Sequence, residues 1–103
     1  ALDMATRRYF NHIDPDGYGP NHWLGVAGCL PDPYPPNGNS TESITLNYFD
    51  ARDAWAALVR SKPHEAHVRG SHPFWALHNE IGIGWYMNDY GAFFAVMSTE
   101  ACD

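Results

Sequence analysis

Two histidines and a glutamate are the residues of this chain best suited to metal or acid–base chemistry. His12, Glu42 and His64 are far apart in the sequence, and each lies in a turn-rich segment or at an expected helix edge. Two neutral imidazoles that meet in a fold can bind a divalent metal ion, while a carboxylate orients one ring or a bound water. His67 follows His64 by three residues, so on a helix both side chains would share one face. The sequence therefore predicts a site lined by His12, Glu42 and His64, with His67 beside it.

Each of these residues also has a simpler interpretation when it is taken alone. His12 at a helix end is suited to binding helix carbonyl groups, and His64 and His67 fit the surface of a short helix. Their spacing lacks the His-Glu-x-x-His pattern of a zinc protease helix. Glu42 alone is typical of a solvated or helix-capping carboxylate. Three further histidines are predicted to lie at the surface or to support the site from behind: His22, His72 and His78.

Two other kinds of site are not favoured. Asp14, Asp16 and Gly17 resemble the opening of a calcium-binding loop, but the later ligands and the closing Glu are missing, so a turn is predicted. No Gly-x-Ser-x-Gly motif is present. Cys29 lies in a proline-rich segment without a recognised signature of a nucleophilic cysteine.

The composition indicates one small folded domain. The chain has 103 residues, of which 45% are hydrophobic and 17% charged, and this balance argues against disorder. Six basic against twelve acidic residues give a formal net charge of −6, and no basic cluster exceeds Arg7-Arg8. Nucleic acid is therefore not expected as a partner, because phosphate binding requires a basic surface. No apolar run reaches the ~20 residues of a membrane-spanning helix.

The hydrophobic periodicity and the turn residues predict the elements that position these side chains. Helices are expected over residues 2–11, 21–26, 51–60 and 63–69, with an extended piece over 43–46 and a hairpin over about 80–98. Asn21 and Asp50 are expected to cap two of the helices. The segment 29–41 is too rich in proline for a helix or strand and is expected to be a loop.

The hairpin is the clearest of these elements. Apolar residues alternate along both of its strands, and Asn88-Asp89-Tyr90-Gly91 is typical of the turn between them. Gly82 and Gly84 leave one face of the first strand bare, so another group is expected to pack closely on that face. The inward face of helix 51–60 is predicted to consist of Ala54, Trp55, Leu58 and Val59.

The pairing of the two cysteines, Cys29 and Cys102, is left open by the residues alone. A disulfide between them would close a loop of about 74 residues and contribute on the order of 4 kcal/mol of stability if it is unstrained. Two buried thiols are the alternative.

A series of short motifs between residues 3 and 94 occurs in an order that is known from other proteins. The motifs are Asp3-Met4-Ala5, Tyr9-Phe10-Asn11-His12, Pro15-Asp16-Gly17, Glu42-Ser43-Ile44, Trp55, Ser61-x-x-His64, Glu80-Ile81-Gly82-Ile83-Gly84, Tyr90-Gly91 and Phe93-Phe94. Their order resembles the CAP superfamily (cysteine-rich secretory proteins, antigen 5 and pathogenesis-related proteins), in its bacterial SCP-like form. Asn11 stands where that family usually has Ser, and Ser43 where it has Asn.

The resemblance implies an α+β fold, a three-layer α-β-α sandwich with a small antiparallel sheet. Residues 1–103 would form a single CAP/SCP-like domain that lacks the family's first helix, so a preceding segment or a neighbouring chain would cover the core. The resemblance also implies a large cleft in which His12 and His64 bind zinc or another divalent cation, next to Glu42. One glutamate of the family's site falls on Leu58, so the family's set of four side chains is incomplete here.

The function implied by the resemblance is that of a secreted domain, extracellular or periplasmic, whose cleft binds a metal, a small molecule, a lipid, a glycan or a peptide without catalysis. In such an oxidising compartment Cys29 is expected to pair with Cys102. The alternative is a metal-assisted hydrolase, a peptidase or esterase, with His12 and His64 as metal ligands and Glu42 as general base. Hydrolytic metal sites usually have three protein ligands. Two histidines therefore favour binding, and His67 as a third ligand would favour catalysis.

Overall fold

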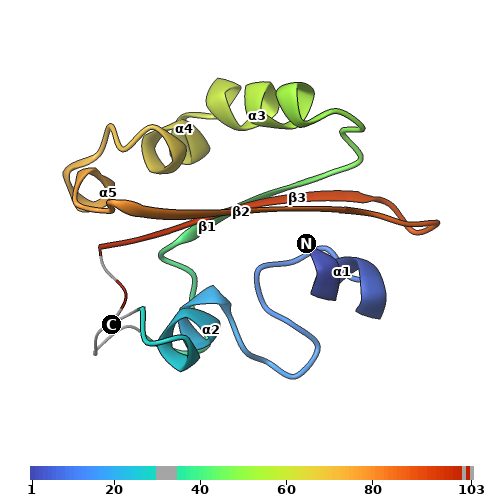
Figure 1. Cartoon of the computed structure of the whole chain (residues 1–103), viewed down its shortest axis with the longest axis horizontal. Coiled ribbons are helices and arrows are strands. Elements are labelled where there is room, and N and C mark those ends of the chain that lie inside the picture. Colours follow the sequence, from blue (N-terminus) through green and yellow to red (C-terminus); the bar gives the residue numbers. More distant parts are fainter. Residues whose placement is uncertain (30–34, 101, 103) are drawn as a thin grey trace.

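A three-stranded antiparallel sheet lies in the middle of the structure, which is a computed structural model that describes residues 1–29, 35–100 and 102. The strands are β1 (Glu42–Leu46), β2 (Glu80–Met87) and β3 (Ala92–Thr99), and their order in the sheet is β1-β3-β2. In Figure 1, α1 and α2 lie on one side of the sheet and α3, α4 and α5 lie on the other. The predicted α+β class with a small antiparallel sheet is therefore confirmed.

The central strand β3 has apolar side chains on both of its faces, so it takes part in two separate cores. One face packs on α1 (Leu2–Arg7) in a cluster of buried residues formed by Met4, Ala5, Ile44, Phe93 and Ala95. The opposite face packs on α3 (Ala51–Arg60) in a second cluster formed by Ala54, Leu58, Phe94 and Val96. Adjacent residues of a strand point to opposite faces, which explains how one apolar run supplies both clusters.

The helices that follow β1 agree closely with the sequence. α3 has the predicted bounds, and Asp50 caps it by accepting a hydrogen bond of 2.7 Å from the backbone N–H of Arg52. α4 (Lys62–Val68) begins one residue before the predicted helix. The short helix α5 (Pro73–Ala76) was not predicted, although a proline at its first position is typical of a helix start.

The prediction of a helix over 2–11 was wrong at its C-terminal end. α1 ends at Arg7 because Arg8 adopts a left-handed conformation with φ 60°. The backbone N–H of Tyr9 then donates to the carbonyl of Met4 at 3.1 Å, which closes the last turn. The segment that contains His12 is therefore a loop and not the end of a helix.

The predicted cap at Asn21 was also wrong. α2 (Pro20–Val26) begins one residue earlier, and Gly19 is the residue before its first turn. Asn21 is buried inside the helix, where its side chain donates to the carbonyl of Pro35 at 3.2 Å and accepts from the backbone N–H of Ser40 at 2.9 Å. Asn21 therefore ties α2 to the segment before β1. Residues 30–34 of the predicted proline-rich loop lie outside the described residues.

The hairpin of β2 and β3 is present, and the backbone N–H of Asn88 donates to the carbonyl of Gly91 across its turn at 3.0 Å. The close packing expected on its two glycines is absent at Gly82, and at Gly84 it is limited to a contact with Ala1, the residue before α1. A methyl group added to Gly82 would meet no described atom within 4 Å, and one added to Gly84 would meet only Ala1, at 3.5 Å. The reason is that β2 lies at the edge of the sheet and is largely exposed.

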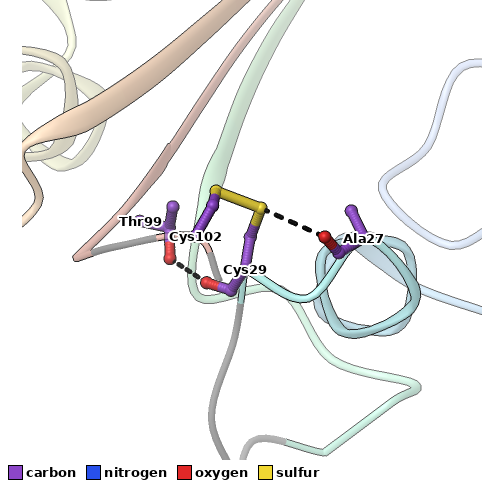
Figure 2. The surroundings of a disulfide bond; sticks show 4 residues. All are labelled: Ala27, Cys29, Thr99 and Cys102. Atoms are coloured by element: carbon purple, nitrogen blue, oxygen red, sulfur yellow. Dashed lines mark hydrogen bonds between the residues drawn. A yellow bond between two sulfur atoms is a disulfide. The ribbon is translucent and has the colours of Figure 1, made fainter.

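A disulfide joins Cys29, just after α2, to Cys102, beyond the end of β3 (Figure 2). This is the pairing that the resemblance implied. Next to it, the hydroxyl of Thr99 donates a hydrogen bond to the carbonyl of Cys29, so backbone and disulfide hold the same two segments together. None of the helices among the described residues is long and apolar enough to cross a membrane.

Candidate functional site

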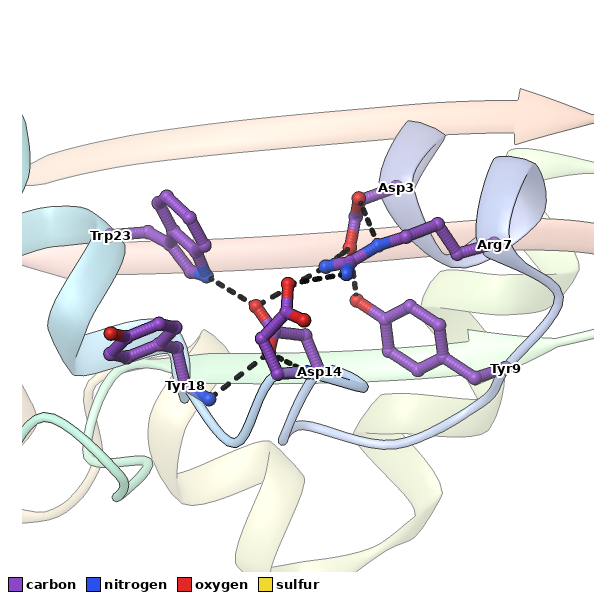
Figure 3. A network of polar contacts seen from close by, with 7 residues as sticks. Asp3, Arg7, Tyr9, Asp14, Tyr18 and Trp23 are labelled. Carbon is purple, nitrogen blue, oxygen red and sulfur yellow. Dashed lines mark hydrogen bonds and ion pairs between the residues drawn. The ribbon is translucent and has the colours of Figure 1, made fainter.

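The loop that presents His12 is fixed by the buried carboxylate of Asp14 (Figure 3). One oxygen of Asp14 accepts hydrogen bonds from the backbone N–H groups of Asp16 and Tyr18, at 2.9 and 3.0 Å. The other oxygen accepts from the indole N–H of Trp23 in α2 at 3.2 Å. The Asp-Pro-Asp-Gly segment is thus a turn, as predicted, and its first carboxylate binds the loop to α2.

Arg7 of α1 also binds this loop, through ion pairs with Asp14 and Asp16. Its guanidinium lies 3.3 Å from Asp14 and 2.9 Å from Asp3 (Figure 3). It also lies 2.7 Å from Asp16. The phenol of Tyr9 donates to Asp3 at 2.5 Å. Burial acts to raise the pKa of Asp14, but the backbone donors and the charge of Arg7 outweigh it and hold that pKa below its usual value. The carboxylate is therefore ionised at neutral pH, and the loop stays attached to α1.

His12 and Glu42 form a direct contact at the start of β1. Nδ1 of His12 lies 2.9 Å from Oε1 of Glu42, and both side chains are partly buried. Asn39 fixes the backbone of Glu42 on both sides, because its side chain accepts from the Glu42 N–H at 2.8 Å and donates to the Glu42 carbonyl at 3.0 Å. The backbone that carries the Glu42 carboxylate is therefore itself held by two hydrogen bonds.

His64 reaches the same place from the other side of the sheet. It lies in the first turn of α4, where its Nδ1 is 2.9 Å from the hydroxyl of Ser61. Glu42 is on the face of β1 that packs on α1, since Ile44 on that face belongs to the α1 cluster, whereas the neighbouring Ser43 points to the α4 face. A cavity of about 180 Å³ extends around this end of β1. Its lining includes His12, Glu42, Ser43, His64 and His67.

His67 is part of a buried chain of hydrogen bonds. Its Nδ1 lies 2.7 Å from the hydroxyl of Ser43 and its Nε2 lies 2.8 Å from the hydroxyl of Ser98, which also contacts Nδ1 of His78 at 2.7 Å. Burial, and then the neighbouring imidazole of His78, lower the pKa of His67 to about 4. Burial also lowers the pKa of His78. Both rings are therefore neutral at pH 7, and both nitrogens of His67 are already bonded to hydroxyl groups.

The four side chains predicted for the site, His12, Glu42, His64 and His67, thus line one cavity. Of the histidines predicted to be peripheral, His22 stacks on Tyr18 with 4.0 Å between ring centres. His72 caps α5 by accepting from the backbone N–H of Phe74 at 3.1 Å. The sequence reasoning missed the roles of three serines. Ser61 lies three residues before His64, and this spacing is a usable signal in the sequence. Ser43 and Ser98 come from two paired strands, so their contacts with His67 depend on the sheet.

A second and larger cavity, of about 320 Å³, shares His12 and Glu42 with the first. Its remaining wall is largely apolar and includes Met4, Tyr9, Pro20, Trp23 and Met97. The His12–Glu42 pair therefore separates a polar cavity that His64 lines from an apolar one beneath α1 and α2.

Among the described residues, no group of three or more His, Cys, Asp or Glu side chains has the spacing to hold a metal ion by itself. No known protein family, curated protein or solved structure matches this chain.

Proposed function

We propose that this chain is a CAP-like domain that binds a divalent cation, such as zinc, through His12 and His64, with Glu42 orienting one ring. The observation that supports this is that both imidazoles line one cavity with their Nδ1 atoms held by oxygen atoms of Glu42 and Ser61. Histidines that bind metals commonly have this arrangement, in which one ring nitrogen is oriented by an oxygen and the other faces the metal. No described group bonds Nε2 of either ring, so two imidazole nitrogens are available for a cation.

The hydroxyl of Thr41 is a further reason to expect a polar ligand in this cavity. Thr41 belongs to the cavity lining, is buried, and its Oγ1 has no hydrogen-bond partner among the described residues. Buried polar atoms nearly always have a partner, which can be water. A hydrated cation would bring such water to the cavity.

The second cavity supports an organic ligand beside the cation. Its volume of about 320 Å³ and its apolar wall are typical of a site for a small molecule or for part of a lipid, glycan or peptide. His12 and Glu42 lie where such a ligand would meet the polar cavity. A bound ligand would then contact aromatic side chains at one end and the cation at the other.

The remaining features implied by the resemblance are part of the same proposal. Helices on both sides of the sheet support a three-layer α-β-α sandwich (Figure 1). The Cys29–Cys102 disulfide supports a secreted domain, since disulfides persist in oxidising compartments. Metal-assisted hydrolysis has weaker support, because His67 uses both ring nitrogens for Ser43 and Ser98 and so does not supply a third metal ligand.

The test of the cation site is zinc uptake by the purified protein. We expect one zinc ion per chain by calorimetry and by metal analysis, with Zn–N distances of about 2.0–2.1 Å in X-ray absorption spectra. The double substitution His12→Ala and His64→Ala should abolish this uptake and leave the circular dichroism spectrum unchanged. The matched control is His22→Ala with His72→Ala, which removes two histidines outside the cavity. Equal zinc binding by the two double variants would contradict the proposal.

A panel of peptide and ester substrates, assayed with and without a chelator, separates binding from hydrolysis. We expect no metal-dependent turnover, because only two histidines face the cation. Turnover that disappears on addition of the chelator and in Glu42→Gln would instead establish the hydrolase, with Glu42 as the general base.

A further inference from the structure

β2 is an edge strand without the usual protection against pairing with another strand. Within the described residues it pairs with β3 alone, and it is eight residues long. It contains no Lys and no Pro, and Glu80 is its only charged residue. Edge strands of natural proteins are normally short, charged, bulged or covered, because unpaired N–H and C=O groups bind other strands. The opposite edge strand, β1, has only five residues.

The side chains of β2 are apolar and exposed as well. Four residues on the face opposite α1 form a row with 38 to 61% of their surface accessible: Ile81, Ile83, Trp85 and Met87. Of the helices on this side, α3 and α4 pack over β1, and among the described residues the row remains exposed. Such a row beside an unpaired edge indicates an interaction surface.

We propose that two copies of this chain pair through β2, antiparallel and about a two-fold axis at Gly84, so that their three-stranded sheets join into one of six strands. The sequence of β2 is complementary to itself in this register. Ile83 lies opposite Trp85 of the second copy, and Ile81 lies opposite Met87. Aromatic and β-branched residues that face each other across strands stabilise a sheet.

The two glycines select this register over the neighbouring one. With the axis at Gly84, Gly82 lies opposite Tyr86 of the second copy, and the aromatic ring covers the space that the glycine leaves. With the axis at Ile83, Gly82 would face Gly84 and both would remain bare. The chosen register also brings Glu80 opposite Asn88, next to the turn where Arg8 binds Asp89 at 3.0 Å. The charge of Asp89 at this turn is balanced by Arg8, so Glu80 would meet a paired carboxylate and not a free one.

Sedimentation equilibrium over a range of protein concentrations tests the dimer. We expect a reversible dimer for the unchanged chain. Ile83→Lys should raise the dissociation constant at least about tenfold, because it replaces an apolar cross-strand contact by two like charges near the axis. The matched control is Val26→Lys, which places the same charge on an exposed apolar residue of α2 and should not change the dissociation constant. A monomer at all concentrations, or equal effects of the two substitutions, would overturn the proposal.

Cysteine crosslinking tests the register. Gly84→Cys places two thiols opposite each other across the axis, with Cβ atoms about 5 Å apart, so mild oxidation should give a covalent dimer on a non-reducing gel. Gly82→Cys is the control, because it lies on the same face and a side chain added there meets no described atom within 4 Å. In the dimer, the two Gly82→Cys thiols would be on the order of 13 Å apart along the strands and should not crosslink. Crosslinking of Gly82→Cys as readily as Gly84→Cys would refute the register.

Discussion

The double substitution Cys29→Ser and Cys102→Ser is expected to lower the free energy of unfolding by about 4 kcal/mol. The disulfide joins residues that are 73 positions apart, so in the unfolded chain it closes a long loop and removes much of its conformational freedom. Domains of this size have a total stability of about 5–15 kcal/mol, so the loss is a large fraction of the whole. Urea denaturation followed by tryptophan fluorescence measures it.

The control for this prediction is reduction of the unchanged chain. Dithiothreitol should shift its urea midpoint to that of the double variant and should leave the double variant where it is. The hydrogen bond from Thr99 to the Cys29 carbonyl needs no sulfur, so it should not account for the shift. A double variant as stable as the oxidised chain would show that the disulfide adds nothing to the free energy of unfolding.

Acidification from pH 6.5 to pH 4 is expected to cost about 3 kcal/mol of stability through His67 alone. The imidazole is 6% exposed and lies between two serine hydroxyls, and its pKa falls from 6.5 to about 4 in the folded chain. The unfolded chain therefore binds a proton between these pH values and the folded chain does not. The stability that neutral His67 contributes to the folded chain is present in full above about pH 6.5 and is lost as the pH falls to 4.

His67→Gln isolates this effect, because glutamine keeps hydrogen-bonding groups but does not titrate. At pH 7 the variant should be less stable than the unchanged chain, since its side chain cannot match both contacts. The difference in stability between pH 7 and pH 4 should nevertheless be smaller in the variant by about 3 kcal/mol. His22→Gln, at the partly exposed ring on Tyr18, is the matched control and should keep the pH dependence. The same pH dependence in His67→Gln would place the titrating group elsewhere.

The parts of the fold that depend on local chemistry could be predicted from the sequence. The bounds of α3 follow from its apolar periodicity and from Asp50, which caps it. The hairpin follows from alternation on two strands around a four-residue turn. The end of α1 could not be predicted, because the residues around Arg8 are compatible with continued helix and the left-handed conformation depends on the loop that Asp14 holds.

The candidate site was predicted through the order of its motifs and not through any local pattern. Nothing near His12 in the sequence indicates that its ring lies against Glu42, because that contact depends on where the loop crosses the end of β1. The burial of His67 depends on the pairing of β1 with β3, which brings Ser43 and Ser98 to opposite edges of one ring. Sequence reasoning about single elements cannot supply such long-range juxtapositions.

The two apolar clusters of this domain share the single strand β3, so they are expected to unfold together. Phe93 and Ala95 belong to one cluster, and Phe94 and Val96 belong to the other. If β3 detaches, both clusters lose their partners at once, so neither layer of helices can persist as an independent folding unit. Native-state hydrogen exchange should therefore find the amides of α1, β3 and α3 opening together in one cooperative event, with the free energy of global unfolding. The domain is then two cores in space but one unit in thermodynamics.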